Sequence, residues 1–418
     1  MLPDQPKQQI AISERELVIM LALLQALHAF AVDAMLPALG LISNELNVTD
    51  PNKRQLIIGM FLLGLGVGSL IPGSLADRFG RKTILLVCVA GYVVLSLASA
   101  LVTDIDVLIG MRFLLGIISS GLSVLPQAII RDRFEGDRMA RLQSMIAMIF
   151  LVVPMLAPSI GQAIMLFASW RWIFGAMGLV GMLMMGWAWK RLPETLHPEY
   201  RQTIRPATIA RNMGEAVMTR SSIGYVLGSA CMLGVGWGYI QSSQQLVAEH
   251  FGAGTLFPVI FGGMALAMAT SNFANSRIVE RFGARRVSHA ALLTYLTISL
   301  VQFWLAQSGH QTLWQFVIVQ TLSMMLMGFV GANFGSIALQ PFARIAGAAS
   351  SVQAFIRMVL ASLIGWAVGQ SYDQTAVPYS QALVLSGVLT LALVLFSEKG
   401  RLFRRLNKPG AAHPVSAP

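Results

Sequence analysis

Two ionisable side chains of opposite charge stand deep inside long apolar stretches of this sequence. Asp33 lies deep within one run that is almost free of charge, and Arg112 lies within another. A charged side chain at the centre of a bilayer costs roughly 3 kcal/mol on insertion scales, so such residues usually face a cavity or a partner. A carboxyl group in that position can take up and release a proton. Asp33 is therefore the predicted proton carrier, and Arg112 is predicted to modulate its proton affinity.

The depths of these two side chains in their runs are similar. Asp33 lies about nine residues, or roughly 13 Å, from the far end of its run at 1.5 Å per helical residue. Arg112 lies about seven residues, or roughly 10 Å, from the corresponding end of its own run. An ion pair between them is therefore geometrically possible. A static pair that only fixes helix packing is the alternative to a role in proton or substrate binding.

Two further ionisable residues in apolar runs are candidates for contacting a substrate. His28 could be a second titratable site, but it stands about 140° around a helix from Asp33, and a packing histidine is an equal alternative. Arg357 lies near the middle of another run. Together with Arg112 it would make the interior more cationic than Asp33 can balance. This excess favours a substrate with an anionic or strongly polar group.

The run that contains Trp237, Tyr239 and Gln241 combines aromatic and polar side chains. Such a combination suits a drug-like ligand, and an interfacial aromatic belt is the alternative. Asn333 is a weaker candidate in a further run. The sequence has no phosphate loop, metal cluster or nucleophile constellation, so we expect no catalytic residue, no metal, no cofactor and no use of ATP.

The apolar runs that carry these residues are predicted to be membrane-spanning helices. Hydrophobic residues make up 55% of the 418 residues and charged residues 12%, with a mean hydropathy of +0.66, whereas a soluble protein has about 25% charged residues. A span needs about 20 apolar residues. Twelve runs qualify, at 17–42, 54–76, 83–102, 105–130, 140–167, 170–189, 222–248, 255–277, 287–307, 312–338, 345–371 and 377–398. We therefore predict an all-α polytopic membrane protein.

Basic residues are distributed unevenly between the loops that join these runs. If the N-terminus is cytoplasmic, the outer loops contain Lys53, Arg54 and Arg171, and nearly all other Lys and Arg residues fall in inner segments. This asymmetry predicts that both termini lie inside. It also accounts for the net charge of +11 without nucleic acid, and anionic lipid headgroups are the expected contact.

The chain carries the sequence signs of an internal duplication. Asp77-Arg78-Phe79-Gly80 is matched by Glu280-Arg281-Phe282-Gly283, and Ala140-Arg141 is matched at the same interval by Ala343-Arg344. Two parallel six-helix halves are typical of a transporter, with substrate expected near the midplane between them. The predicted parts are a cytoplasmic tail at 1–16, a six-helix bundle at 17–190, a linker at 191–221, a second bundle at 222–398 and a tail at 399–418.

Several motifs resemble those of a known family. Gly73-Ser-Leu-Ala-Asp77-Arg78-Phe-Gly80-Arg81-Lys82, between the second and third runs, resembles the signature loop of the major facilitator superfamily. Three stretches resemble its Bcr/CflA drug-resistance branch, namely Asp33-Ala-Met-Leu36-Pro37-Ala38-Leu39, Arg112-Phe-Leu-Leu-Gly116 and Ile130-Arg131-Asp132-Arg133-Phe134-Glu135-Gly136-Asp137. The resemblance implies two pseudo-symmetric six-helix bundles and proton-driven export of drug-like molecules.

The resemblance also implies roles for individual residues. Arg112 matches an arginine implicated in proton transfer. Ala157-Pro158-Ser-Ile-Gly161 resembles the antiporter motif and should bend the fifth span. In the implied cytoplasmic latch Asp77 would pair with Arg131, and Gly73 would permit close helix contact. Such a latch would favour the outward-facing state. Its residues are Gly73, Asp77, Arg78, Gly80, Arg81, Lys82 and Arg131.

These observations together predict a monomeric antiporter of a bacterial inner membrane that exports a drug or metabolite as a proton moves in. Its partners would be the small-molecule substrate, protons and the lipid bilayer. The first alternative is an uptake symporter or metabolite exporter on the same fold, because a fold does not set the direction of transport. The second alternative is a sensor, or a channel without proton coupling.

Overall fold

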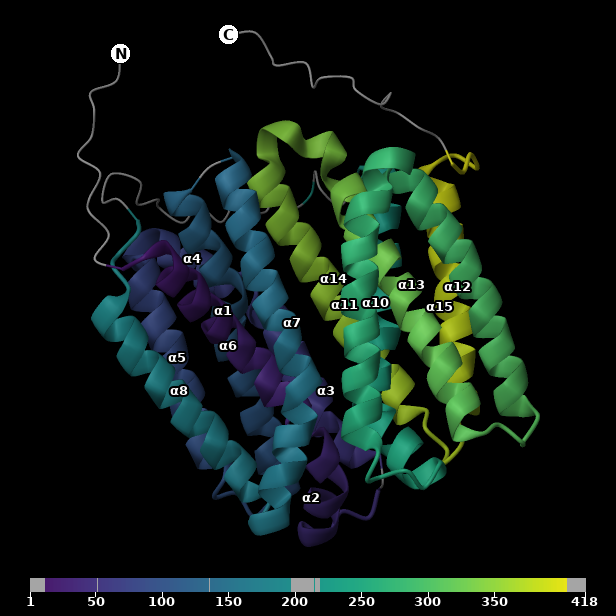
Figure 1. Ribbon diagram of the computed structural model, residues 1–418, viewed down its shortest axis with the longest axis horizontal. Helices are drawn as coiled ribbons and strands as arrows, with labels where there is room; N and C mark the ends of the chain where they lie inside the picture. Colours follow the sequence, from purple (N-terminus) through teal and green to yellow (C-terminus); the bar gives the residue numbers. More distant parts are fainter. Residues whose placement is uncertain (1–11, 51, 135, 197–213, 215–218, 404–418) are drawn as a thin grey trace, which may run out of the picture. The chain divides into compact units, whose positions relative to one another are not determined.

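The computed structural model describes residues 12–50, 52–134, 136–196, 214 and 219–403. Every regular element within these ranges is helical (Figure 1). In chain order the elements are α1 (Glu14–Asp33), η1 (Leu36–Ala38), α2 (Leu39–Glu45), η2 (Lys53–Gln55), α3 (Leu56–Gly68), α4 (Ile71–Phe79), α5 (Arg81–Ser99), α6 (Ile105–Arg133), α7 (Gly136–Phe167), α8 (Arg171–Arg191), α10 (Arg220–Gln244), η4 (Gln245–His250), α11 (Phe257–Phe282), α12 (Ala284–Gln307), α13 (Leu313–Leu339), η5 (Gln340–Ile345), α14 (Ala346–Gln370) and α15 (Val377–Ser397).

The number of candidate membrane spans agrees with the sequence. In the part of the chain that the structure describes, eleven helices are long and apolar enough to cross a membrane. A twelfth span arises when Lys53–Gly68 and Ile71–Phe79, which meet at an angle of 45°, count as one. Large exposed side chains such as Phe167 and Val259 are what a lipid-facing surface requires. The predicted all-α polytopic class is confirmed.

Two compact units divide the chain. The first comprises Met1–Leu46 and Met60–Ile204, and the second comprises Asn47–Gly59 and Arg205–Pro418. Asn47–Gly59 therefore groups with the second unit, although the prediction placed it within the bundle at 17–190. The predicted tails and the linker at 191–221 lie largely outside the described residues, and their boundaries stay predictions.

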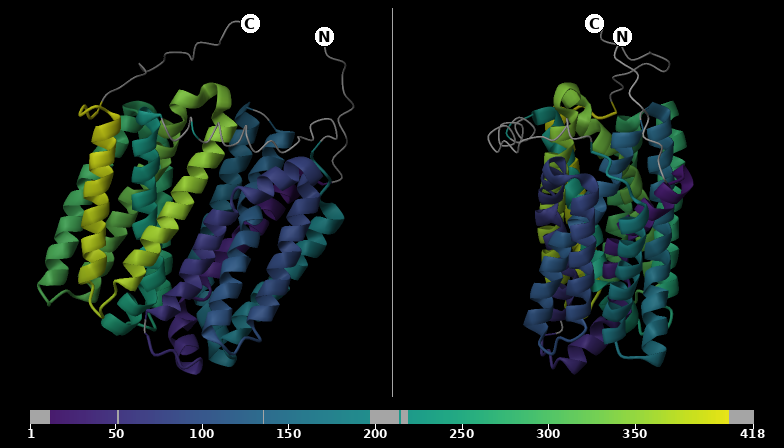
Figure 2. Two further views of the ribbon diagram at one scale, coloured as in Figure 1. Left: turned by 180° about the vertical axis from the view of Figure 1, so that it is seen from behind. Right: turned by 90° about the vertical axis from the view of Figure 1, so that its left-hand side faces the viewer.

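Close helix packing builds the first unit. Helix α5 packs against α6 and α8, and α1 packs against α6 and α7 (Figure 2). Two glycines bring α3 and α6 together: a Cβ atom at Gly64 would lie 2.1 Å from the carbonyl oxygen of Phe113, and one at Gly116 would lie 2.1 Å from that of Phe61. Any larger residue would separate the two helices. In the second unit α10 packs against α13, α14 and α15, and α12 packs against α13 and α15.

The first predicted span, at 17–42, is interrupted directly after Asp33. Helix α1 ends at Asp33, and the short helices η1 and α2 follow it. The amide of Ala34 still donates to the carbonyl of Phe30 at 3.1 Å. Pro37 has no N–H group, so the carbonyl of Asp33 loses the donor that a continuous helix would supply four residues later. The local sequence thus places the deepest acid at a helix end.

Candidate functional site

Asp33 and Arg112 are both buried in the first unit. Their residues are 5% and 0% exposed. The Arg112 guanidinium donates to the carbonyl oxygen of Ala31 at 2.7 Å and lies 4.6 Å from the centroid of the Phe61 ring. Ala31 belongs to the last turn of α1, where carbonyl groups have no donor within the helix. Arg112 therefore supplies a missing hydrogen bond beside the break.

The structure brings Asp33 and Arg112 to the same end of α1 and bonds Arg112 to the helix backbone instead of to the carboxylate. Ala31, which accepts the hydrogen bond, stands two residues before Asp33. Among the residues that the structure describes, no ion pair is formed by the Asp33 carboxylate. The static ion pair considered from the sequence is therefore not the observed arrangement. The roles of both residues in proton coupling stay predictions.

Gly161 of α7 lies against the chain immediately after Asp33. A Cβ atom at Gly161 would lie only 1.9 Å from the carbonyl oxygen of Ala34. Ala157, one turn earlier, is fully buried. On another side of α1, the hydroxyl group of Tyr92 donates to the carbonyl of Leu27 at 3.0 Å. Helices α5, α6 and α7 thus all contact the second half of α1 or the chain directly after it, near Asp33.

Replacing Gly161 by Ala is expected to lower both thermal stability and transport. The added methyl group would overlap the Ala34 carbonyl, and overpacking of this kind costs about 1–3 kcal/mol. Gly186→Ala is the matched control, because a Cβ atom there meets nothing within 4 Å. Thermal unfolding of both purified variants and efflux from cells would be compared. Equal behaviour of the two variants would contradict the proposed contact.

His28 lies on α1 with its ring against α7. Its imidazole stacks on Phe150, with 5.3 Å between ring centroids and 25° between planes. Its buried Nδ1 atom has no hydrogen-bond partner among the described residues, and the same holds for the side-chain oxygens of Gln25 and Gln162. Stacking favours packing, while the unpartnered nitrogen leaves a ligand role open.

The predicted residues Trp237 and Tyr239 lie in the core of the second unit. Tyr239 is fully buried. Its ring lies 5.7 Å from that of Tyr379 and 6.4 Å from that of Phe261, and its hydroxyl group meets the Met264 sulfur at 3.1 Å. Trp237 is 9% exposed. The interfacial belt that was the alternative is wrong for Tyr239, because its contacts are with α11 and α15.

Gln241 is the most unusual of the predicted ligand residues. Its side-chain amide is buried, and neither the oxygen nor the nitrogen has a hydrogen-bond partner among the described residues. A Cβ atom at Gly59 would lie 2.6 Å from its oxygen, and one at Gly365 would lie 3.0 Å from its nitrogen. The two glycines therefore make room for the amide group. A buried amide without partners costs about 1–3 kcal/mol, which a polar ligand could recover.

Asn333 and Arg357 differ in how well their polar groups are satisfied. The Asn333 amide donates to the side chain of Asn275 and to the carbonyl of Phe329, both at 2.8 Å. The Nε atom of Arg357 is buried and has no partner among the described residues. Arg357 therefore remains the stronger ligand candidate of the two.

The charged cluster at the start of α5 differs from the predicted latch in its pairing. Asp77 forms an ion pair with Arg81 at 2.6 Å, and Arg81 Nε donates to Asp132 at 2.9 Å. The predicted pairing of Asp77 with Arg131 is wrong, since Asp77 pairs with Arg81 and it is Asp132, next to Arg131, that contacts the cluster. A Cβ atom at Gly73 would meet the nearest side chain only at 3.9 Å, so the expected tight contact there is also wrong.

Glu194 closes this cluster from the end of α8. Its carboxylate accepts hydrogen bonds from the backbone amides of Arg81 at 2.8 Å and Lys82 at 3.2 Å. These are the first amides of α5, which have no acceptor within the helix. Gly80 adopts φ +105°, and a Cβ atom there would lie 2.4 Å from the Glu194 carboxylate. A glycine is thus required at this position. Arg78 faces outward, with its guanidinium 5.2 Å from the Phe79 ring.

Replacing Glu194 by Ala is expected to lower the thermal unfolding temperature by a few degrees. The substitution leaves the first amides of α5 without their acceptor, and loss of a helix cap costs about 1 kcal/mol. Glu280→Ala removes an exposed acid and serves as the control. Differential scanning fluorimetry of the purified variants is the measurement. A Glu194 variant as stable as the Glu280 variant would argue against the cap.

A network of amide groups holds Asn47–Gly59 within the second unit. The side chain of Asn52 donates to the carbonyls of Gln370 at 3.2 Å and Tyr372 at 2.8 Å, and Gln370 returns a bond to the carbonyl of Asn52 at 3.0 Å. Arg54 pairs with Glu249 at 2.6 Å. These bonds explain why the segment departs from the predicted boundary.

Burial and the negative charge of Glu249 raise the pKa of Tyr372, in the same network, to about 12. The phenol therefore keeps its proton at physiological pH, and it donates to the carbonyl of Gln245 at 3.3 Å. The amide of Gln55 donates to the side-chain oxygen of Gln245. None of these residues was singled out from the sequence. Single polar residues at the ends of spans and in the segments between them give no signal of their partners.

In the described part of the chain, no group of three or more His, Cys, Asp and Glu residues could hold a metal ion. Cys88 and Cys231 are free thiols within it.

The described helices define a polytopic helical membrane protein, and the family model and the relatives that match it are those of transporters rather than of enzymes. The chain belongs to the Major Facilitator Superfamily, whose family model matches residues 21–369. An uncharacterized MFS-type transporter of Bacillus subtilis, YdgK, is 30% identical, covering 89% of this chain and 93% of the relative.

Relatives with more informative names are similar over most of their length. A bicyclomycin resistance protein homolog of Haemophilus influenzae is 28% identical over 86% of this chain and 90% of the relative. The multidrug resistance protein MdtL of Klebsiella pneumoniae is 29% identical over 81% and 85%. The crystal structure of a D-xylose-proton symporter shares the fold, with a TM-score of 0.73, 14% identity and coverage of 92% of this chain and 98% of that one.

Proposed function

We propose that the chain is a proton-driven exporter of drug-like molecules in a bacterial inner membrane, working by alternating access with both termini in the cytoplasm. Relatives named for resistance to bicyclomycin and to multiple drugs support this proposal. Its antiporter-like motif, whose Gly161 lies against the break in α1, supports export over uptake.

The observation that carries the proposal is the position of Asp33. A buried carboxylate without an ion-pair partner at a helix end carries a large desolvation cost. Proton uptake removes that cost, and proton release restores it. The two protonation states of Asp33 would therefore favour different surroundings, which is the requirement for coupling a proton to a conformational change.

Arg112 would respond to the charge of Asp33. In the observed arrangement its guanidinium is bonded to the Ala31 carbonyl, which suits a neutral Asp33. An ionised Asp33, two residues further along α1, would compete for the same guanidinium with a charge-assisted hydrogen bond, which is roughly twice as strong as a neutral one. Exchange of Arg112 between the two acceptors would change the contact of α6 with the end of α1.

The substrate would be a small molecule with a polar or anionic group. The unpartnered atoms of His28, Gln241 and Arg357 offer a hydrogen-bond acceptor, an amide and a guanidinium. Asp33 and Arg112 would contribute to the same ligand in one state of the cycle, with Trp237, Tyr239 and Asn333 as structural support. A proton and a substrate that compete for overlapping states give exchange.

Alternating access requires the two halves to change their relative arrangement. Asn47–Gly59 is joined at both ends to pieces of the first unit, yet its hydrogen bonds are to residues of the second. The two ends of this segment are therefore where the chain passes between the units.

Everted membrane vesicles with an acidic interior provide the test. Addition of a transported drug should release protons, seen as recovery of acridine orange fluorescence, in vesicles with the protein and not in vesicles without it. Transport of the drug without proton movement would overturn the proposal in favour of a facilitator or channel. Movement of drug and protons in the same direction would overturn it in favour of a symporter.

A further inference from the structure

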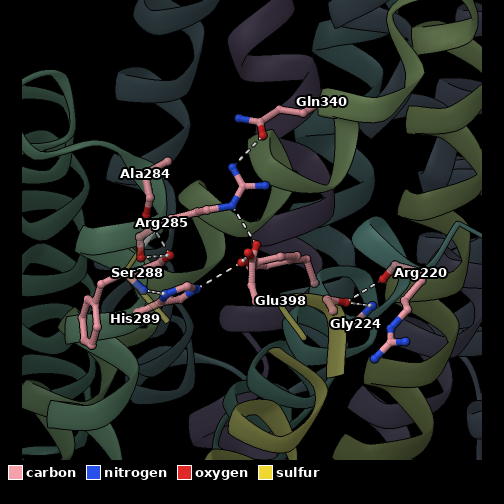
Figure 3. Close-up of polar contacts among 11 residues, drawn as sticks. Arg220, Gly224, Ala284, Arg285, Ser288, His289, Gln340 and Glu398 are labelled. Carbon is pink, nitrogen blue, oxygen red and sulfur yellow. Dashed lines mark hydrogen bonds and ion pairs between the residues drawn. The ribbon is translucent and has the colours of Figure 1, made fainter. Parts of the chain in front are cut away.

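A second cluster of titratable groups lies at the end of the second unit where α12 begins and α15 ends. Figure 3 shows the Arg285 guanidinium between Gln340 and Glu398. Arg285 Nε donates to the Glu398 carboxylate at 2.7 Å, and the hydroxyl group of Tyr225 donates to the same oxygen at 2.7 Å. His289 Nε2 lies 3.0 Å from that hydroxyl group. His289 and Tyr225 are 1% and 0% exposed.

The hydrogen bonds of this cluster assign the tautomer of His289. The backbone amide of Phe403 donates to His289 Nδ1 at 3.1 Å, so Nδ1 carries no proton. The hydroxyl group of Tyr225 donates its only proton to Glu398, so in its contact with His289 Nε2 it must be the acceptor. The ring is therefore neutral, with its proton on Nε2. Every donor in this chain of bonds has an acceptor.

The segment that donates to His289 is held in a strained conformation. Phe403 has a φ of +62° and Lys399 a φ of +53°, values that cost free energy in residues other than glycine. Two groups hold Phe403: His289 Nδ1 accepts from its amide, and Arg286 Nε donates to its carbonyl at 3.2 Å. The Phe403 ring also meets the imidazole edge to face, with centroids 5.8 Å apart. Loss of the hydrogen bond from the Phe403 amide to His289 would therefore favour release of this segment.

Protonation of the ring is incompatible with that bond. A proton on Nδ1 would point at the Phe403 N–H group. The two nitrogen atoms are 3.1 Å apart, and at that distance two donors would repel each other. The other bonds survive, because Nε2 still donates to Tyr225. We propose that His289 is a second proton-binding site of the protein and that proton binding there releases the docked segment Lys399–Phe403. Docking and proton binding exclude each other and so are reciprocally linked.

The groups around His289 allow it to hold the proton once the segment has left. Burial raises the pKa of Glu398, but hydrogen bonds from Arg285 and Tyr225 and the Arg285 charge outweigh burial, so the pKa of Glu398 is lowered. The carboxylate therefore stays ionised where a histidine titrates and attracts the imidazolium. Arg285, on the same helix, and Arg286, at Phe403, oppose it. Tyr225 of α10 is neutral, and Gln340 after α13 carries no charge.

The site is separate from the proposed proton carrier. Asp33 belongs to the first unit, and His289, Tyr225 and Glu398 belong to the second. The cluster lies at the start of α12 and directly after α15, on the side predicted to be cytoplasmic, so it would sense internal pH. His289 would bind its proton whether or not the protein transports protons.

A spin label on the docked segment tests the inference. Arg401 is exposed, so the label would be attached at Arg401→Cys in a chain with Cys88→Ser and Cys231→Ser, reconstituted in lipid nanodiscs. Lowering the pH from about 8 to about 5, which brackets the titration of histidine, should convert a restricted spectrum into a mobile one. A restricted spectrum over the whole range would overturn the proposal.

Two variants separate His289 from other titrating groups. His289→Asn can keep an acceptor near Nδ1 but cannot take a proton, so its label should stay restricted at every pH. Glu398→Gln removes the anion that favours the imidazolium and should lower the midpoint by roughly one pH unit. A His289→Asn variant that titrates like the parent would overturn the proposal. If that variant fails to fold, hydrogen exchange at the Phe403 amide of the unmodified protein is the second measurement. After correction for intrinsic rates, exchange should be at least about tenfold faster at the lower pH. An unchanged rate would also overturn the proposal.

Discussion

Replacing Asp33 by Asn is expected to abolish proton-driven efflux while retaining most of the substrate affinity, because the amide can still form hydrogen bonds with the ligand. The amide has nearly the same volume as the carboxyl group and imitates its protonated form, so α1 and its break after Asp33 should persist. It cannot release a proton. We expect active efflux to fall by about 100-fold or more, as is common when a proton-transfer group is removed. Drug extrusion from energised cells, corrected for protein level, is the measurement.

Exchange experiments show whether the loss concerns coupling or folding. In proteoliposomes without a pH gradient, the Asp33→Asn variant should still exchange labelled for unlabelled substrate at a rate within a few-fold of the parent. Asp33→Glu should regain part of the active efflux. Glu45→Gln is the matched control, since this acid lies in the same candidate span but is half exposed and pairs with Arg171. Full active efflux by Asp33→Asn would exclude Asp33 as the proton carrier.

Replacing Arg112 by Met is expected to have the second largest effect. Methionine fills the apolar surroundings beside Phe61 but leaves the Ala31 carbonyl without its donor. An unsatisfied buried group of this kind costs about 1–3 kcal/mol. Removal of the guanidinium also removes the group that is proposed to respond to the charge of Asp33. We expect both proton-driven efflux and passive exchange to fall at least about tenfold, which corresponds to 1.4 kcal/mol.

The matched control for Arg112 is the other arginine within a span. Arg357→Met makes the same chemical change in the second unit, where the structure shows an unpartnered Nε atom instead of a bond to a helix end. We expect it to raise the KM for an anionic substrate and to leave the pH dependence of transport unchanged. If Arg112→Met altered only the KM, or if Arg357→Met altered the pH dependence, the assignment of Arg112 to coupling would be wrong.

The spans could be predicted because a bilayer imposes one length and one polarity on every helix that crosses it. The predicted runs at 83–102 and 377–398, for example, correspond to α5 (Arg81–Ser99) and α15 (Val377–Ser397). The same reasoning found Asp33 and Arg112, because a charge in hydrocarbon is exceptional whatever its partners are. Composition and periodicity are sufficient for statements of this kind.

Partners could not be predicted in the same way. Arg131 and Asp132 are adjacent in the chain, but successive residues point about 100° apart around a helix, and only the packing of α6 decides that Asp132 meets Arg81. The segment around Tyr239 has the composition of a ligand site, yet Tyr239 packs against Phe261 and Tyr379, which come from two other helices, α11 and α15. The carboxylate of Glu194 caps α5 from the end of α8 for the same reason.

The sequence by itself determined the helical membrane class, the family and the buried acid, because each depends on local composition or on a contiguous motif. Tertiary structure alone decided what each polar group bonds to: Arg112 meets the Ala31 carbonyl, Asn52 meets the end of α14, and His289 meets the Phe403 amide. These contacts join residues that are distant in the chain. Their geometry depends on how the helices pack, which no single segment encodes.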